Sequence, residues 1–183
     1  MRPADDARRL FSPIAANYDR PAQVLSLFQY RRWHRFLLHR LELTAPARIL
    51  DMASGTGAVA LQLARRPGLQ VVAADITRPM LRQALARARR NGLRQALHFA
   101  ECTAEAIPFP DAAFDAVIFT YLLRYVSDVP AALEELARVL KPGGMMLSLD
   151  FGVPKGVIYP PWRLYTSLLL PAGGALLSPA WRE

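Results

Sequence analysis

Short apolar runs alternate with segments of helical periodicity along the middle of the chain. Runs this apolar are typical of strands covered on both faces, which need no alternation of apolar and polar residues. They predict five strands, over residues 49–52, 71–75, 97–101, 114–120 and 145–151.

The segments between these runs predict helices with recognisable ends. A helix is expected over 59–66. The next should be capped by Thr77 and end at Asn91–Gly92, where glycine can turn left-handed. A third helix should be capped by Ser127 or Asp128 and should stop at Pro142–Gly143–Gly144. Its Leu133, Leu136 and Leu140 are expected to face inward.

Strands that alternate with helices indicate crossover connections and therefore a parallel sheet in an α/β protein. A helical stretch precedes the sheet. Its apolar positions recur at helical spacing, and we expect them to pack against the core: Tyr30, Trp33, Leu37 and Leu41.

The composition is that of one folded domain. The chain has 183 residues, of which 52% are hydrophobic and 21% charged, so disorder is excluded. A single cysteine, Cys102, excludes an intrachain disulfide and a cysteine-rich zinc site, and we expect it to be a small buried filler. The three histidines are scattered, at His34, His39 and His98, so we predict no metal site.

The net charge of +8 comes almost entirely from arginine. An anionic partner is one interpretation, and a compositional bias is the other. We favour the bias because the arginines are scattered over helical faces, and no basic block with interleaved aromatics predicts a nucleic-acid surface. The N-terminus lacks an apolar signal-peptide region, and no apolar stretch reaches roughly 18 residues. We therefore expect a cytoplasmic protein.

A glycine-rich loop joins the first predicted strand to the helix after it. Gly55-x-Gly57-x-x-Ala60 satisfies a relaxed dinucleotide-binding pattern, in a context that lets backbone approach a nucleotide-like ligand. Asp75 lies twenty residues after Gly55, where a carboxylate can accept hydrogen bonds from ribose hydroxyls. The loop alone leaves a nicotinamide cofactor and S-adenosylmethionine both open.

Asp51, at the end of the first strand, distinguishes the two cofactors. Its charge would oppose a pyrophosphate and attract the ammonium and sulfonium groups of S-adenosylmethionine. The alternative is that Asp51 only caps the loop backbone. We favour the cationic ligand.

Several blocks of residues, in order, resemble class I S-adenosylmethionine-dependent methyltransferases. The general ones are Ile49-Leu50-Asp51-x-Ala53-x-Gly55-Thr56-Gly57, Val72-x-Ala74-Asp75-Ile76 and Arg138-Val139-Leu140-Lys141-Pro142-Gly143-Gly144. More specific ones resemble the ubiquinone/menaquinone C-methyltransferase family: Phe11-x-x-Ile14-Ala15-x-x-Tyr18-Asp19, Ala104-Glu105-x-Ile107-Pro108-Phe109-x-Asp111-x-x-Phe114-Asp115, Leu123-Arg124 and Asp150-Phe151-Gly152-x-Pro154.

The resemblance implies a fold and a cofactor site. The fold is a Rossmann-like doubly wound parallel sheet of order 3-2-1-4-5, with an N-terminal helical lid over residues 1–45 and the core over 46–183. Thr103 departs from the acidic or amide residue that the family often has, so it can contact the adenine without a charge. The residues implied for S-adenosylmethionine are Asp51, Ala53, Gly55, Thr56, Gly57, Asp75, Ile76, Thr103, Ala104 and Thr120.

The resemblance also implies C-methylation of a demethylated quinol. Arg124 is the candidate cation beside the acceptor's ionised oxygen, with a surface ion pair as its alternative. Tyr18 and Asp19 match the family's lid and complete the candidate catalytic residues. Ala22 and Phe28 depart from the pattern and leave the acceptor open. Other small-molecule acceptors, a nicotinamide-dependent oxidoreductase and a fragment that only binds cofactor are the alternatives.

The last part of the chain bears on the partners. The apolar, proline-broken tail over 157–177 is expected to cover the core, to shape a pocket for an isoprenoid-bearing ring, or to rest on a membrane. The family continues for two more strands, so strand five would be a bare edge. Three explanations are open: the tail drapes over this edge, a second copy of the chain pairs with it in a homodimer, or the sequence is a fragment. We favour the fragment.

Overall fold

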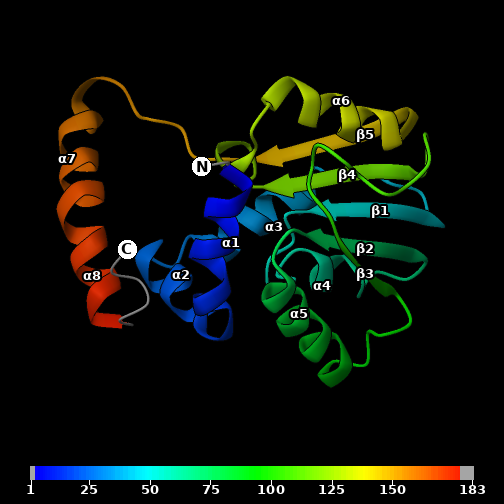
Figure 1. The fold of residues 1–183 in the computed structure, drawn as a ribbon, viewed down its shortest axis with the longest axis horizontal. Coiled ribbons are helices and arrows are strands. Elements are labelled where there is room, and N and C mark those ends of the chain that lie inside the picture. The colour runs from blue at the N-terminus through cyan, green and yellow to red at the C-terminus, as the bar shows by residue number, and fades with distance from the viewer. Residues whose placement is uncertain (1–2, 178–183) are drawn as a thin grey trace.

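A five-stranded parallel sheet forms the centre of the molecule, with order β3-β2-β1-β4-β5 (Figure 1). The computed structural model describes residues 3–177, with side chains over 5–173. The predicted strand order is confirmed. The strands are β1 (Ala47–Met52), β2 (Leu69–Asp75), β3 (Leu97–Glu101), β4 (Phe114–Thr120) and β5 (Leu140–Leu149).

Helices precede the sheet, connect its strands and follow it (Figure 1). The N-terminal ones are α1 (Pro3–Ile14), α2 (Asp19–Leu25) and α3 (Tyr30–His39). The connecting ones are α4 (Ala60–Leu63), α5 (Arg78–Arg90) and α6 (Val129–Val139). The C-terminal ones are α7 (Tyr159–Leu164) and α8 (Leu170–Leu177), joined without a break by a π-helical turn, η4 (Tyr165–Leu169).

Both faces of the sheet are buried, which explains why its strands are apolar at almost every position. Alternate residues of β1 belong to different cores, with Ile49 on one face and Leu50 on the other. The first face packs on Leu37 and Leu38 of α3 together with α4, and the second packs on α6. The helix α3 is therefore part of the core, as its apolar stripe predicts. The division of the chain at residues 45 and 46 stays a prediction.

Two helices differ from expectation, one in its length and one in its cap. The helix α4 is shorter than the predicted 59–66, because Pro67 disfavours helical geometry at the residue before it and Gly68 has a φ of +79°. Thr77 occupies the N-cap position of α5 without a side-chain cap. Its backbone N–H instead donates to Asp75 Oδ1 at 2.7 Å, so the expected capping role is wrong.

The junction of α6 with β5 also differs. Asp128 is the N-cap, and its carboxylate accepts a hydrogen bond from the Ala131 N–H at 3.0 Å. The helix ends at Val139, before the predicted stop, and Leu140 already belongs to β5 with a ψ of 135°. Leu136 is buried and Leu140 is half-buried against the same core, whereas Leu133 is exposed, so one of the three expected inward leucines is wrong.

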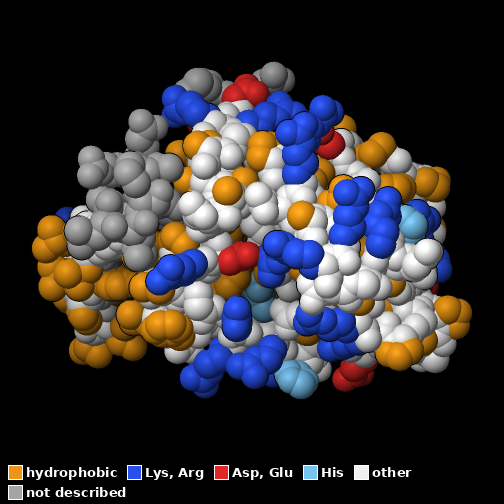
Figure 2. Space-filling model, turned by 90° about the horizontal axis from the view of Figure 1, so that it is seen from below, with side chains coloured by type: hydrophobic (Ala, Val, Ile, Leu, Met, Phe, Trp, Pro, Cys, Tyr) orange, Lys and Arg blue, Asp and Glu red, His pale blue; other side chains and the backbone are white. Residues whose placement is uncertain are grey.

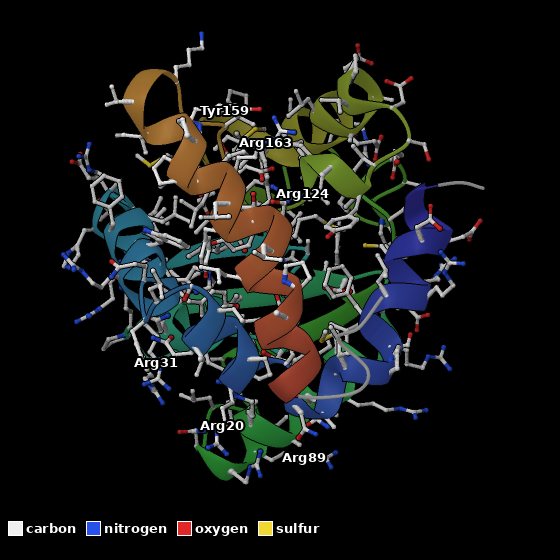
Figure 3. The ribbon with its side chains drawn as sticks, turned by 90° about the vertical axis from the view of Figure 1, so that its left-hand side faces the viewer. Arg20, Arg31, Arg89, Arg124, Tyr159 and Arg163 are labelled. Atoms are coloured by element: carbon white, nitrogen blue, oxygen red, sulfur yellow. The ribbon has the colours of Figure 1, made fainter. Side chains whose placement is uncertain are left out.

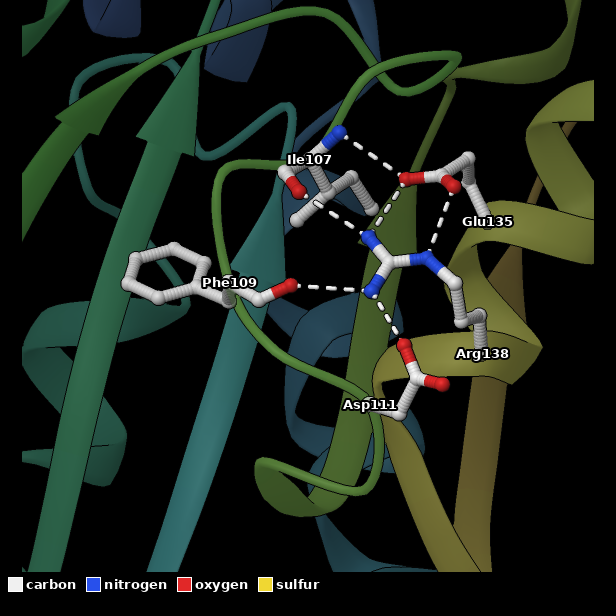
Figure 4. Close-up of polar contacts among 5 residues, drawn as sticks. All are labelled: Ile107, Phe109, Asp111, Glu135 and Arg138. Atoms are coloured by element: carbon white, nitrogen blue, oxygen red, sulfur yellow. Dashed lines mark hydrogen bonds and ion pairs between the residues drawn. The ribbon is translucent and has the colours of Figure 1, made fainter.

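Arg138 of α6 holds the segment between β3 and β4 against the sheet (Figure 4). Its guanidinium donates to the carbonyls of Ile107 and Phe109 at 3.0 and 2.9 Å, and it pairs with Glu135 and Asp111. Glu135 in turn accepts from the Ile107 N–H at 3.0 Å. Arg138 therefore fixes four groups, and Glu135 fixes a fifth.

The C-terminal helices lie beyond the carboxyl ends of the strands (Figure 1). Pro160 and Pro161 stand in the first turn of α7, where proline is tolerated, so they do not break the helix. Pro171 lacks the N–H that would bond to residue 167, and the π-helical turn directly precedes it. Within residues 150–177 the tail contacts α2 through α8 and leads away from β5 (Figure 1), so the expectation that it drapes over β5 is wrong for this part of the chain. Among the helices within residues 3–177, none is long and apolar enough to cross a membrane.

Candidate functional site

A cavity of about 980 Å³ opens at the carboxyl ends of the strands. Parallel α/β sheets bind ligands at this edge, where connections leave in opposite directions. The cavity is bounded by the glycine loop after β1, the segments after β2, β3 and β4, and the N-terminal helices. Figure 3 shows α7 and α8 crossing in front of it, between α1 and α3.

The glycine loop is tied to the end of β2. Gly55 has a φ of +54°, and its N–H donates to Asp75 Oδ2 at 2.8 Å. Because Asp75 also accepts from Thr77, the carboxylate organises both loops. Burial raises its pKa, and these two hydrogen bonds offset part of the rise. The loop and Asp75 therefore form one wall of the cavity, as their spacing predicts.

Gly57 serves a different purpose from Gly55. A Cβ on Gly57 would lie 3.0 Å from the Ala84 Cβ of α5, and its φ is +78°. A Cβ on Gly55 would meet nothing within 4 Å. Gly57 thus permits close packing behind the loop, and Gly55 shapes the surface that faces the cavity.

Asp51 is a fully buried carboxylate on the cavity wall. Neither of its oxygens has a hydrogen-bond partner of good geometry among the described residues. Burial raises its pKa to about 8, and the nearby Ala60 N–H offsets part of that effect. A buried carboxylate without a donor is costly unless a cation approaches it, so this wall fits a positively charged ligand group. The Ala60 N–H at the start of α4 approaches the same carboxylate, so Asp51 also has the backbone contact of the alternative capping role.

Most of the predicted site residues meet at this cavity. Three do not line it: Asp19, Thr56 and Gly57. The ten that do are Tyr18, Asp51, Ala53, Gly55, Asp75, Ile76, Thr103, Ala104, Thr120 and Arg124.

Asp19 and Thr56 instead bond to each other behind the cavity wall. The Thr56 hydroxyl donates to Asp19 Oδ1 at 2.6 Å, and Arg87 of α5 donates to Asp19 Oδ2 and to the Thr56 carbonyl. This contact joins α2, the glycine loop and α5. Both carboxylate oxygens of Asp19 are occupied, which favours a positioning role over contact with substrate.

Arg124 and Tyr18 stand on opposite elements of the cavity. Arg124 donates to Asp150 Oδ1 at 2.8 Å, and its guanidinium lies over the Phe151 ring at 5.2 Å. Its ion pair is half-exposed, so the cation remains available to a ligand in the cavity. Tyr18 packs edge-on against Phe11, and burial holds the pKa of its phenol far above the usual range. Tyr18 is therefore not a base near neutral pH.

Comparison with known proteins identifies the family. Residues 3–183 match the model of the ubiE/COQ5 methyltransferase family. The chain belongs to this family. It is 44% identical to the demethylmenaquinone methyltransferase of Thermus thermophilus over 171 residues, which cover 92% of this chain and 77% of that protein. It is 35% identical to the ubiquinone/menaquinone biosynthesis C-methyltransferase UbiE of Hahella chejuensis over 173 residues, 93% of this chain and 70% of that one.

Solved structures show the same fold in proteins with different chemistry. The [4+2]-cyclase SpnF superposes with a TM-score of 0.65 at 31% identity, over 69% of this chain and 46% of its own. Since a shared fold does not fix a reaction, the methyltransferase assignment rests on the family match. The cofactor is S-adenosylmethionine, which the unpaired Asp51 carboxylate suits. The family does not favour a nicotinamide-dependent alternative.

The cavity of this methyltransferase also contains aromatic residues that were not predicted as site residues. Tyr121 directly follows β4 with a φ of +57°, and its ring stacks on Phe151 at 4.5 Å. Tyr30 and His34 of α3 lie beside it. The position of Tyr121, one residue beyond Thr120 at the carboxyl end of a strand, is the signal that could have identified it. Nothing local in the sequence marks His34, because its place depends on how α3 packs.

Proposed function

We propose that this methyltransferase transfers a methyl group to a ring carbon of a demethylated quinol. The observation that carries the proposal is one cavity that holds both the cofactor wall and a cation beside aromatic side chains. The relatives named above, demethylmenaquinone methyltransferase and UbiE, support the choice of acceptor class.

The residues of the chain supply position and electrostatics. Bound S-adenosylmethionine supplies an electrophilic methyl group, and Asp51 attracts its cationic part. Arg124 stabilises the ionised hydroxyl of the acceptor, which raises electron density on the ring carbon that is methylated. The ring carbon forms the new C–CH₃ bond as the methyl–sulfur bond breaks, which leaves S-adenosylhomocysteine. The ring carbon then gives up its proton to water and the ring regains aromaticity. The aromatic walls exclude water, because Tyr30, Tyr121 and Phe151 surround that end of the cavity.

Methyl transfer tests this proposal directly. Incubation with S-adenosylmethionine labelled in the methyl group and a short-tailed demethylated quinol should give a labelled quinol. Arg124→Gln should lower kcat at least tenfold, with unchanged cofactor affinity, because its cation acts on the acceptor. Arg90→Gln at the end of α5, an exposed residue outside the cavity lining, is the matched control and should retain activity. Cofactor binding without transfer to any quinol would show that the acceptor is another small molecule.

We also propose peripheral contact with an anionic membrane. Residues 20–41 include Arg20, Arg31, Arg32, Arg35 and Arg40, residues 151–177 include Lys155 and Arg163, and neither segment contains Asp or Glu. The two segments touch, since α2 contacts α8 and Tyr165 donates a hydrogen bond to the Leu25 carbonyl. Figure 2 shows Lys and Arg side chains spread over one face, with apolar side chains gathered toward α7 and α8.

Large apolar side chains are exposed on both segments. Val157 is 91% exposed, Ile158 61%, and Leu27 and Phe28 65% and 66%. Apolar side chains flanked by cations without acidic neighbours suit the headgroups of an anionic bilayer. The cavity is lined by Leu27, Trp162 and Tyr165 from the same segments, so a lipid-tailed acceptor could enter from the membrane.

Vesicle co-sedimentation tests this contact. Binding to phosphatidylcholine vesicles should appear when phosphatidylglycerol is included, and Arg20→Gln and Arg31→Gln should each weaken it roughly fivefold. Arg90→Gln, at the end of α5 toward the amino ends of the strands, is the control and should bind normally. Equal binding with and without phosphatidylglycerol would overturn the proposal. The predicted homodimer stays a prediction.

A further inference from the structure

Two buried polar atoms without partners lie at the same end of the cavity. The His34 Nε2 and the Tyr121 hydroxyl have no hydrogen-bond partner among the described residues. Both residues line the cavity, and His34 is only 2% exposed. Buried polar atoms in folded proteins are nearly always paired, so two neighbouring exceptions on one cavity wall indicate a ligand that pairs with them.

The two atoms come from different elements. His34 belongs to α3 and Tyr121 follows β4, and their ring centroids are 6.3 Å apart. The Tyr30 and Phe151 rings are both nearly parallel to that of Tyr121, with angles of 19° and 17° between the planes. The rings therefore present flat surfaces around the unpaired atoms, which is suited to a planar aromatic ligand.

The imidazole is neutral. Burial lowers the pKa of His34 to about 4, although Asp19 opposes that effect. A neutral imidazole can donate at one nitrogen and accept at the other, and a phenol can do both. A ligand hydroxyl between them would satisfy both atoms whichever nitrogen carries the proton.

We propose that His34 Nε2 and the Tyr121 hydroxyl bind a ring hydroxyl of the methyl acceptor and thereby orient the ring. This inference rests on the proposed function for the identity of the acceptor. Arg124 lies next to this cluster of rings, because the Phe151 ring contacts both the Arg124 guanidinium and Tyr121. His34 and Tyr121 would thus hold one ring hydroxyl, while Arg124 stabilises the ring oxygen that becomes ionised. The contacts of His34 and Tyr121 orient the ring for this reaction.

Ligand binding tests the site without turnover. Anaerobic titration of tryptophan fluorescence with 1,4-dihydroxynaphthalene should show tighter binding than with 1,4-dimethoxynaphthalene, which has the same ring and no hydroxyl donor. Tyr121→Phe removes one oxygen only and should reduce that preference roughly tenfold, since a buried partner is left unpaired. His34→Leu should do the same, and affinity for S-adenosylmethionine should stay unchanged in both variants.

The controls separate this site from packing effects. Tyr125→Phe alters another cavity tyrosine, which packs on Phe11 rather than on His34, and should retain the preference for the dihydroxy compound. If His34→Leu fails to fold, Tyr121→Phe still decides the outcome. Equal affinity of the wild type for both compounds, or an unchanged preference in Tyr121→Phe, would overturn the proposal. A clear preference without methyl transfer to a quinol would leave the site standing and refute the proposed reaction instead.

Discussion

Arg87 of α5 donates a hydrogen bond to Asp19 of α2 across 68 positions of sequence. The same guanidinium nitrogen reaches the Thr56 carbonyl and hydroxyl, each at 3.0 Å. Asp19 also accepts from the Thr56 hydroxyl, so the first residue of α2 is fixed to the glycine loop. The helix that bounds the cavity through Ala22 and Leu25 is therefore held by a contact outside the cavity.

Removing this contact should loosen α2 more than it destabilises the protein. Arg87→Gln should cost about 1 kcal/mol or less in unfolding free energy, because the pair is partly exposed and screened by solvent. Its affinity for S-adenosylmethionine should fall severalfold, and amide exchange in α2 should accelerate. Arg78→Gln removes an exposed ion pair between α5 and Glu101 of β3. It should leave cofactor affinity and amide exchange in α2 unchanged. Unaltered exchange in Arg87→Gln would refute the positioning role of Asp19.

Asp51 should give stability and cofactor binding opposite dependences on pH. Its pKa rises from an ordinary 3.8 to about 8, so the folded protein holds a proton that the unfolded chain has lost between these values. Its contribution to stability is therefore greatest at low pH and is lost as the pH rises through about 8. The affinity for the cationic cofactor should increase over the same range, because the carboxylate becomes charged.

Melting temperature and calorimetric titration at pH 6 and pH 9 check this prediction. Asp51→Asn should flatten both profiles, whereas the exposed Glu134→Gln should leave them as in the wild type. Cofactor affinity that is independent of pH in the wild type would contradict the role of Asp51.

Arg138 should be needed for the segment between β3 and β4. Arg138→Met leaves the carbonyls of Ile107 and Phe109 without their donor, so the melting temperature should fall by several degrees. Affinity for S-adenosylmethionine should fall too, because Thr103 and Ala104 lead into this segment. Arg90→Met, which also removes a cation from a helix, should have little effect on either.

The ion pair between Arg138 and Glu135 predicts a response to acid. The Arg138 hydrogen bond holds the pKa of Glu135 down to about 2, from an ordinary 4.5. Its contribution to stability is present above about 4.5 and is lost as the pH falls toward 2. Arg138→Met should lose less stability than the wild type on acidification over this range. An equal loss in both proteins would show that Glu135 is not held by Arg138.

The two glycines of the loop should respond differently to alanine. Gly57→Ala should lower the unfolding free energy by about 2 kcal/mol or more, from the left-handed backbone and the contact with Ala84. Gly55→Ala should cost about 1 kcal/mol, since only the backbone strain applies. It should weaken cofactor binding, because Gly55 faces the cavity. Urea unfolding and calorimetry measure the two effects, and equal stability losses would contradict this division.

Local sequence predicted the bounds of two strands correctly. The strands at 97–101 and 114–120 are confirmed at both ends, because apolar residues there are flanked by turns. The start of β5 was predicted five residues late. Glycine and proline at 142–144 suggested a turn, but pairing with β4 extends the strand through them with a register shift. The length of a strand depends on how far it pairs with the neighbouring strand, and its own sequence pattern does not show this.

The sequence by itself determined the parallel sheet, the glycine loop and the family, because hydrophobic period and motif spacing are local properties. It also located ten of the cavity residues. Only the tertiary structure decided that Asp19 and Thr56 bond to each other outside the cavity, and that His34 and Tyr121 lie beside each other within it. The orientation of α2 and α3 decides both, and it is set by packing against residues distant in the chain.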